Sequence, residues 1–132
     1  MFETARPFLL EHVGEPTPYA DISREELLKK VPKSKIKPDQ RITTDANERL
    51  IHARGQSLPD HVAMHSGKIE AYPDGVAYPK TDEDVRELIQ LSRRKGYRLI
   101  PYGGGSSVLG HVNAPCRGGP YITVDMAKMS RL

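Results

Sequence analysis

The chain has 132 residues, of which 37% are hydrophobic and 28% are charged, and its net charge is +3. No run of residues approaches the roughly 20 apolar positions that a membrane-spanning helix needs. The short apolar cluster at residues 8–10 lies too close to acidic side chains to form a secretory signal. A single cysteine, Cys116, excludes an intramolecular disulfide framework and a multi-thiolate zinc site. We therefore expect a cytoplasmic protein.

Basic side chains gather in residues 24–41, which carry seven Lys or Arg and three Asp or Glu. Such a stretch could attract a phosphate-rich partner. It lacks interleaved aromatic residues, however, and Pro32 and Pro38 interrupt any continuous helix. We therefore interpret it as a solvated surface and expect no nucleic-acid partner.

The first 70 residues are expected to form an N-terminal arm with short helices. Five prolines in the first 38 residues indicate irregular chain. One short helix is predicted over residues 23–31, because Ser23 suits an N-cap and lysines occupy the last turn. A weaker helical pattern covers residues 60–65 and is opened by Pro59, which the first turn of a helix tolerates.

A strand, helix and strand follow between residues 75 and 101. The run at residues 76–78 is typical of a strand, and Thr81 with three following acids predicts a helix N-terminus. Apolar residues then recur at helical spacing until Gly96, which suits a left-handed C-cap. A second strand is predicted at residues 97–100, ended by Pro101, with a right-handed crossover between the two strands.

Beyond the glycine-rich segment that follows, residues 121–124 predict a last strand, and residues 126–132 continue toward a helix or turn. No helix stop or polar tail appears at the end of the sequence. We therefore expect the chain to be cut inside a larger fold.

The segment from residue 101 to 110 is the one that indicates chemistry. Three consecutive glycines can adopt positive φ without a Cβ clash, so successive N–H groups can point into one concavity. Ser106 and Ser107 add hydroxyl donors, whereas the segment contains no Lys or Arg. This pattern suits a phosphate or diphosphate bound by backbone groups, although a plain tight turn between strands also uses glycine.

Other nucleotide and catalytic motifs fail at particular positions. The dinucleotide fingerprint fails because Val108 stands where its last glycine is required. The Walker pattern fails because residues 111–112 replace the required Lys and Ser or Thr. Neither Ser106 nor Ser107 lies in the strained turn of a hydrolase nucleophile. We therefore predict no catalytic residue within this chain.

No metal site is predicted either. His61 and His65 are four residues apart, but no third ligand is evident. Cys116 lies beside Arg117 in a glycine- and proline-rich loop, and we interpret it as a spectator thiol.

The order of these features resembles a known family. Residues 73–85, the amphipathic helix, Gly96 and residues 101–110 resemble the first half of the FAD-binding domain of FAD-linked oxidases, the vanillyl-alcohol oxidase or PCMH type. Arg49, Gly55 and the approach at residues 69–74 are most similar to the alkylglycerone-phosphate synthase (alkyldihydroxyacetonephosphate synthase) branch of that family.

The resemblance implies an α+β fold: residues 71–132 would form the first α/β lobe of a PCMH-type FAD-binding domain, preceded by the arm of residues 1–70. It also implies that the glycine-rich loop wraps the FAD pyrophosphate. The cofactor-binding residues would then be Pro101, Tyr102, Gly103, Gly104, Gly105, Ser106, Ser107, Val108 and Gly110. Gly105 stands where some relatives attach the flavin through a histidine, so non-covalent FAD is expected.

The function implied by this resemblance is to hold FAD as the N-terminal portion of an FAD-linked oxidoreductase or a flavin-dependent alkylglycerone-phosphate synthase-like enzyme. Its partners would be FAD, the missing C-terminal part of the same enzyme and further copies in a homo-oligomer, and the isolated chain would be inactive. An alternative is a non-catalytic phosphate- or nucleotide-binding module or a relic fragment. A third hypothesis, an interaction protein with a basic arm, depends only on residues 24–41.

Overall fold

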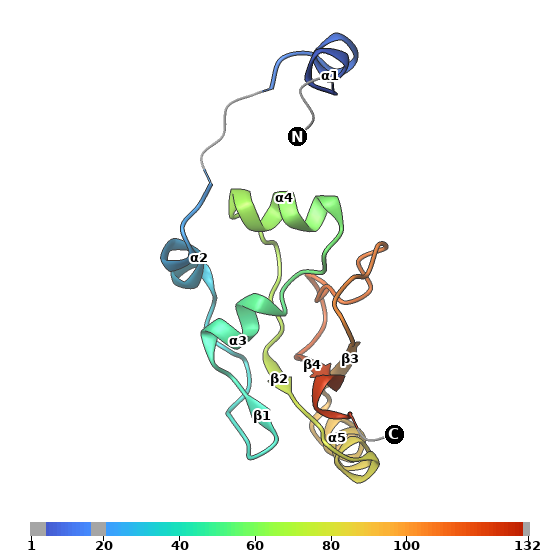
Figure 1. Ribbon diagram of the computed structural model, residues 1–132. Helices are drawn as coiled ribbons and strands as arrows, with labels where there is room; N and C mark the ends of the chain where they lie inside the picture. The colour runs from blue at the N-terminus through green and yellow to red at the C-terminus, as the bar shows by residue number, and fades with distance from the viewer. Residues whose placement is uncertain (1–4, 17–20, 131–132) are drawn as a thin grey trace.

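The computed structural model describes residues 5–16 and 21–130 (Figure 1). Within these ranges no helix is long and apolar enough to cross a membrane. The elements in chain order are α1 (Ala5–Val13), α2 (Arg24–Lys30), β1 (Ile42–Thr43), α3 (Ala46–Ile51), α4 (Leu58–Ser66), β2 (Gly75–Ala77), α5 (Asp82–Lys95), β3 (Arg98–Tyr102), β4 (Tyr121–Asp125) and the 3₁₀ turn η1 (Met126–Lys128).

The strands form one mixed sheet in the order β1-β2-β4-β3. β4 is parallel to both of its neighbours, and Thr123 is in register with Val76 of β2 and Ile100 of β3. β1 is antiparallel to β2 and occupies the outer edge. Because β2, β4 and β3 run in one direction, their carboxyl ends meet at the same edge of the sheet. The fold is therefore α+β, with β2, α5 and β3 as the predicted strand, helix and strand.

The two faces of the sheet are covered by different helices. Ile122 and Val124 of β4 point to one side, where they pack with Leu88 of α5 and with Ile42 of β1. Side chains alternate along a strand, so Thr123 points to the opposite side, where α3 contacts β2. Both faces of the central strand are buried, as is usual for parallel strands.

The predicted helix ends are confirmed. Ser23 caps α2, and Thr81 caps α5 with Asp84 in a reciprocal capping box. Gly96 ends α5 in the left-handed conformation at φ 69°. The weaker pattern at residues 60–65 is also helical, but α4 is longer and begins at Leu58 behind the N-cap Ser57.

The structure differs from the expectations in three respects. The first is α1, in a stretch expected to be irregular because of its prolines. Pro7 lies in the first turn of α1, where its missing N–H is not needed. The ring of His12 also stacks on Phe8 at 4.1 Å, and its Nδ1 lies 2.8 Å from the Phe8 carbonyl oxygen. Local contacts of this kind favour a helix, but they do not produce the regular spacing of apolar residues from which a helix is predicted.

The second difference is that β3 continues through Pro101 instead of ending before it. β3 is the last strand in the sheet order, and proline is tolerated on an edge strand because its nitrogen need not donate to a neighbour. The third is that α3 and β1 form within the predicted arm, and β1 joins the sheet. The proposed boundary between residues 70 and 71 stays a prediction.

Hydrogen bonds of buried polar groups connect the segment before α3 to the sheet. The carboxylate of Asp74, which is 3% exposed, accepts hydrogen bonds at 3.0 Å from the backbone N–H groups of Lys35 and Tyr121. Arg49 of α3 donates to the carbonyl oxygens of Pro73 and Pro32, both at 2.7 Å. These two side chains link three segments that are far apart in the sequence.

We expect the Asp74→Ala substitution to destabilise the protein by at least about 2 kcal/mol, because it leaves two backbone N–H groups without acceptors. The measurement is the free energy of unfolding, from denaturant titrations followed by circular dichroism. The exposed Asp82→Ala in the first turn of α5 is the control, and it should cost less than about 1 kcal/mol. Equal losses in the two variants would contradict a role for Asp74 in joining the segments.

Candidate functional site

The glycine-rich loop begins directly after β3, at the edge where the parallel strands end. Gly103 and Gly104 are exposed, and a Cβ added to either would have no protein atom within 4 Å. Gly105 is buried. The backbone of Gly103 and Gly104 is therefore uncovered, and a ligand can approach it closely.

Only one of the three consecutive glycines uses the left-handed region. Gly105 has φ +70°, whereas Gly103 and Gly104 do not have positive φ. A Cβ at Gly105 would also overlap the hydroxyl group of Tyr102. Of the three positions, Gly105 therefore needs glycine most strictly. A side chain there would resist the backbone conformation and would also collide with Tyr102.

The backbone N–H groups of residues 103–107 face no protein acceptor. Within the described part of the chain, none of them donates a hydrogen bond. Ser106 is exposed, and the hydroxyl of Ser107 accepts a hydrogen bond from the backbone N–H of His111 at 2.8 Å. The loop therefore presents unpaired donors without a cation, which suits an anionic group.

The turn between α3 and α4 supports the loop from one side. The side-chain amide of Gln56 donates to the carbonyl oxygen of Gly104 at 3.0 Å. A Cβ added at Gly55 would lie 3.0 Å from the carbonyl oxygen of Gly105. The carbonyl groups of Gly104 and Gly105 therefore lie against this turn.

A buried carboxylate holds the same turn to the end of the loop. Asn113 accepts a hydrogen bond from the Gly55 N–H at 2.9 Å and donates to Asp60 at 2.8 Å. Burial raises the pKa of the Asp60 carboxyl, but hydrogen bonds from Ser57 and Asn113 favour the carboxylate, and its pKa lies below the ordinary value. Asp60 is therefore an anion at neutral pH that orients Asn113.

The nine residues predicted from the sequence fall within residues 101–110 and form three parts. Pro101 and Tyr102 belong to β3, and residues 103–107 form the crest. Val108 and Gly110 lie on the far side, where they line a cavity of about 390 Å³ with Arg54 and Asp60. Their contact with a cofactor stays a prediction.

A second group of polar side chains lies at the carboxyl edge of the sheet and was not predicted as part of the site. Nε2 of the buried His52 is 3.0 Å from Oδ2 of Asp125, and its Nδ1 is 2.8 Å from the carbonyl oxygen of Glu48. Both partners are acceptors, so the ring donates to both only when each nitrogen carries a proton. His52 follows α3, a helix that the sequence pattern did not indicate, which is why the group was missed.

Two tyrosines enclose His52. The ring of Tyr102 lies edge-on at 4.7 Å and that of Tyr78 at 5.8 Å. Burial raises the pKa of both phenols; the hydrogen bond from Tyr78 to the Glu48 carboxylate raises that of Tyr78 further, and the nearby Asp125 carboxylate raises that of Tyr102. Both therefore stay neutral near pH 7 and act as hydrogen-bond donors or packing groups.

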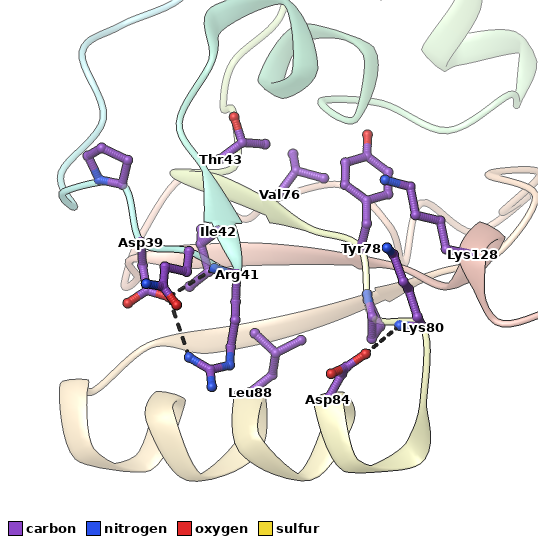
Figure 2. A pocket seen from close by; sticks show the side chains of 13 residues that line it. Asp39, Arg41, Ile42, Thr43, Val76, Tyr78, Lys80, Asp84, Leu88 and Lys128 are labelled. Atoms are coloured by element: carbon purple, nitrogen blue, oxygen red, sulfur yellow. Dashed lines mark hydrogen bonds and ion pairs between the residues drawn. The ribbon is translucent and has the colours of Figure 1, made fainter.

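A larger open cavity of about 610 Å³ lies between β1, α5 and Lys128 (Figure 2). Two of its charged side chains, Arg41 and Asp84, have partners nearby. Arg41 forms an ion pair with Glu87, and the Lys80 backbone N–H donates to Asp84 at 2.8 Å. Figure 2 shows Lys128 beside the ring of Tyr78, with its Nζ 4.7 Å from the ring centre.

The different demands on Gly104 and Gly105 give a structural prediction. Gly105→Ala should lower the free energy of unfolding by about 1–2 kcal/mol or more, because alanine resists the left-handed conformation and would meet the Tyr102 ring. Gly104→Ala should change it by less than about 0.5 kcal/mol, since the added methyl group meets nothing. Thermal and denaturant unfolding of the two variants measure the difference. Similar stabilities would show that the loop does not need the observed Gly105 conformation.

Known proteins resemble this chain both in sequence and in fold. Residues 73–132 match the family model described as an FAD binding domain. The alkyldihydroxyacetonephosphate synthase of Dictyostelium discoideum is 29% identical over 140 residues, covering 98% of this chain and 22% of that protein. The mitochondrial D-lactate dehydrogenase [cytochrome] of Arabidopsis thaliana is 32% identical over 109 residues, covering 79% of this chain and 18% of that protein.

A solved structure of an alkyldihydroxyacetonephosphate synthase superposes with a TM-score of 0.78 at 23% identity, covering 97% of this chain and 26% of that one. The fold therefore extends beyond residues 73–132 to include the preceding arm. The chain spans about a fifth of the length of the curated relatives it matches.

These matches agree with the order of strands, helix and glycine-rich loop in the structure: residues 73–132 match the FAD binding domain family, and the chain shares its fold with an alkyldihydroxyacetonephosphate synthase.

Proposed function

We propose that this chain is the FAD-holding N-terminal portion of a flavin-dependent enzyme similar to alkylglycerone-phosphate synthase, and that its glycine-rich loop binds the FAD diphosphate. The observation that carries the proposal is the row of N–H groups at residues 103–107, which have no acceptor within the described residues. A diphosphate supplies several charged acceptor oxygens, and backbone donors can bind them without a lysine or arginine.

The shape of the loop fits this ligand. Gly103 and Gly104 carry no side chain and have open space around them, so phosphate oxygens can reach the backbone. Gly105, in its left-handed conformation, turns the chain back against Tyr102. The bare crest and the turned backbone together form a concavity of the kind that binds anions.

A bound flavin would supply the redox chemistry, and the protein would supply orientation and electrostatics. In this chain the loop amides would bind the diphosphate, while the Tyr102 ring and the hydrogen bonds of Asn113 keep the loop in shape. We propose that a further polypeptide segment encloses the remaining parts of FAD and provides the substrate site.

A substitution at the crest tests the proposal. Gly104→Val should weaken FAD binding at least tenfold, because its branched side chain would stand between the diphosphate and the loop amides. The fold should persist, since the added Cβ meets no protein atom. Titration of FAD into the apoprotein, followed by flavin fluorescence, measures the dissociation constant.

The exposed Arg93→Ala on α5 is the control and should leave FAD affinity unchanged, because an isolated exposed charge contributes little. Unchanged affinity in Gly104→Val would exclude the loop as the diphosphate site. A wild-type protein that binds ADP but no flavin would instead favour a general nucleotide-binding module.

The mode of attachment gives a separate prediction. Residues 101–110 contain no histidine, and Gly105 is buried against Tyr102. FAD should therefore be held non-covalently, and acid precipitation of the holoprotein should leave the yellow flavin in the supernatant. Flavin that stays with the precipitate would contradict this prediction.

A second candidate within the same cofactor class is an oxidoreductase like the D-lactate dehydrogenase relative. This candidate is supported by the sequence identity of 32% with that dehydrogenase over 79% of this chain. Loss of the yellow flavin absorbance when D-lactate is added anaerobically to the holoprotein would support this candidate over the synthase-like one.

A further inference from the structure

We infer that Gln56 is a positioning residue that fixes the direction of the loop amides before the cofactor binds. This inference rests on the proposed function, because it concerns how the loop is prepared for a diphosphate. Gln56 lies outside the glycine-rich segment, in the turn between α3 and α4.

The hydrogen bond of Gln56 sets the orientation of one peptide group. Its Nε2 donates to the Gly104 carbonyl oxygen at 3.0 Å. In a trans peptide the C=O and the following N–H lie in one plane and point in opposite directions. The N–H of Gly105 must therefore point away from Gln56, toward the side of the loop without a protein acceptor.

The next peptide group is held in a similar direction. The Gly105 carbonyl oxygen would lie 3.0 Å from a Cβ at Gly55, so this carbonyl also lies against the α3–α4 turn. By the same planarity, the N–H of Ser106 points to the opposite side. The positive φ of Gly105 agrees with this, because a residue in the left-handed region allows successive N–H groups to converge on one anion.

The turn that carries Gln56 is itself fixed on both sides. Gly55 donates its N–H to Asn113, and Ser57 caps α4 by a reciprocal pair of hydrogen bonds with Asp60. Gln56 therefore acts from a turn whose two neighbouring residues are both held by hydrogen bonds. Its backbone does not have to be ordered when a ligand arrives.

Among the hydrogen bonds of the described residues, only that of Gln56 holds the peptide between Gly104 and Gly105. Within the described residues, no other hydrogen bond reaches the Gly104 carbonyl, and the Gly105 N–H donates none. Glycine backbones have many accessible conformations, so this peptide would reorient freely without Gln56. Ordering it on binding would cost affinity, which a preformed loop avoids.

The test compares two Gln→Met substitutions in the full-length protein. Gln56→Met keeps the length of the side chain and adds no charge, but it removes the donor. We expect it to weaken the binding of FAD and of ADP by the same factor, about five- to tenfold, which corresponds to the cost of ordering the backbone of one residue on binding. Gln90→Met, at an exposed position of α5, is the matched control and should leave both affinities unchanged.

Thermal unfolding separates positioning from a structural role. Gln56→Met should leave the melting temperature within a degree or so of wild type while it accelerates amide hydrogen exchange at Gly105. A melting temperature lowered together with affinity would overturn the inference, because Gln56 would then only stabilise the fold.

The crest variant separates this inference from the proposed function. If Gly104→Val weakens FAD binding and Gln56→Met does not, the loop is the diphosphate site and the inference is wrong. If neither variant affects FAD binding, or the wild-type protein binds no FAD, the proposed function fails and the inference fails with it.

Discussion

The buried carboxylate of Asp74 is the constraint on which the rest of the arrangement depends. It receives one backbone N–H from the segment before β1 and another from the start of β4. Arg49 adds hydrogen bonds from α3 to the carbonyl groups of Pro32 and Pro73. An unpaired buried donor or acceptor is costly, so these groups place the arm, α3 and β2 in one arrangement. The position of α3, and of the turn that follows it, is a consequence.

Parallel pairing then concentrates the polar groups at one edge. β4 lies between β2 and β3, and the carboxyl ends of all three strands meet at one edge of the sheet. Tyr78 directly follows β2, Tyr102 ends β3, and the glycine-rich loop starts after it. α3 brings His52 to the same edge, where it contacts Asp125. The sheet therefore presents backbone donors on the loop beside a buried polar group that keeps Tyr102 in place. A rigid base of this kind is what a loop of small residues needs in order to hold one shape.

The loop contains no Lys or Arg, so any anion it binds must be held by its backbone N–H and hydroxyl groups. Backbone donors are weak individually, and their value depends on several of them pointing at the same place. Gln56, Gly55 and the left-handed Gly105 together give that common direction. In the proposed function, the α3–α4 turn orients these donors toward one anion, which a lysine or arginine would instead attract by its charge.

The sequence by itself determined the elements whose signals are local. Ser23 and Thr81 predicted helix starts, Gly96 predicted the end of α5, and the resemblance of residues 73–110 to an FAD-binding domain implied the fold class. Only the tertiary structure decided that the two-residue strand β1 joins the sheet, because its pairing with β2 depends on residues 33 and 35 positions away. It also decided which glycine takes positive φ, and that Gln56 and His52 lie beside the loop. Those features arise from contacts across long sequence separations, which depend on packing and leave no periodic pattern in the chain.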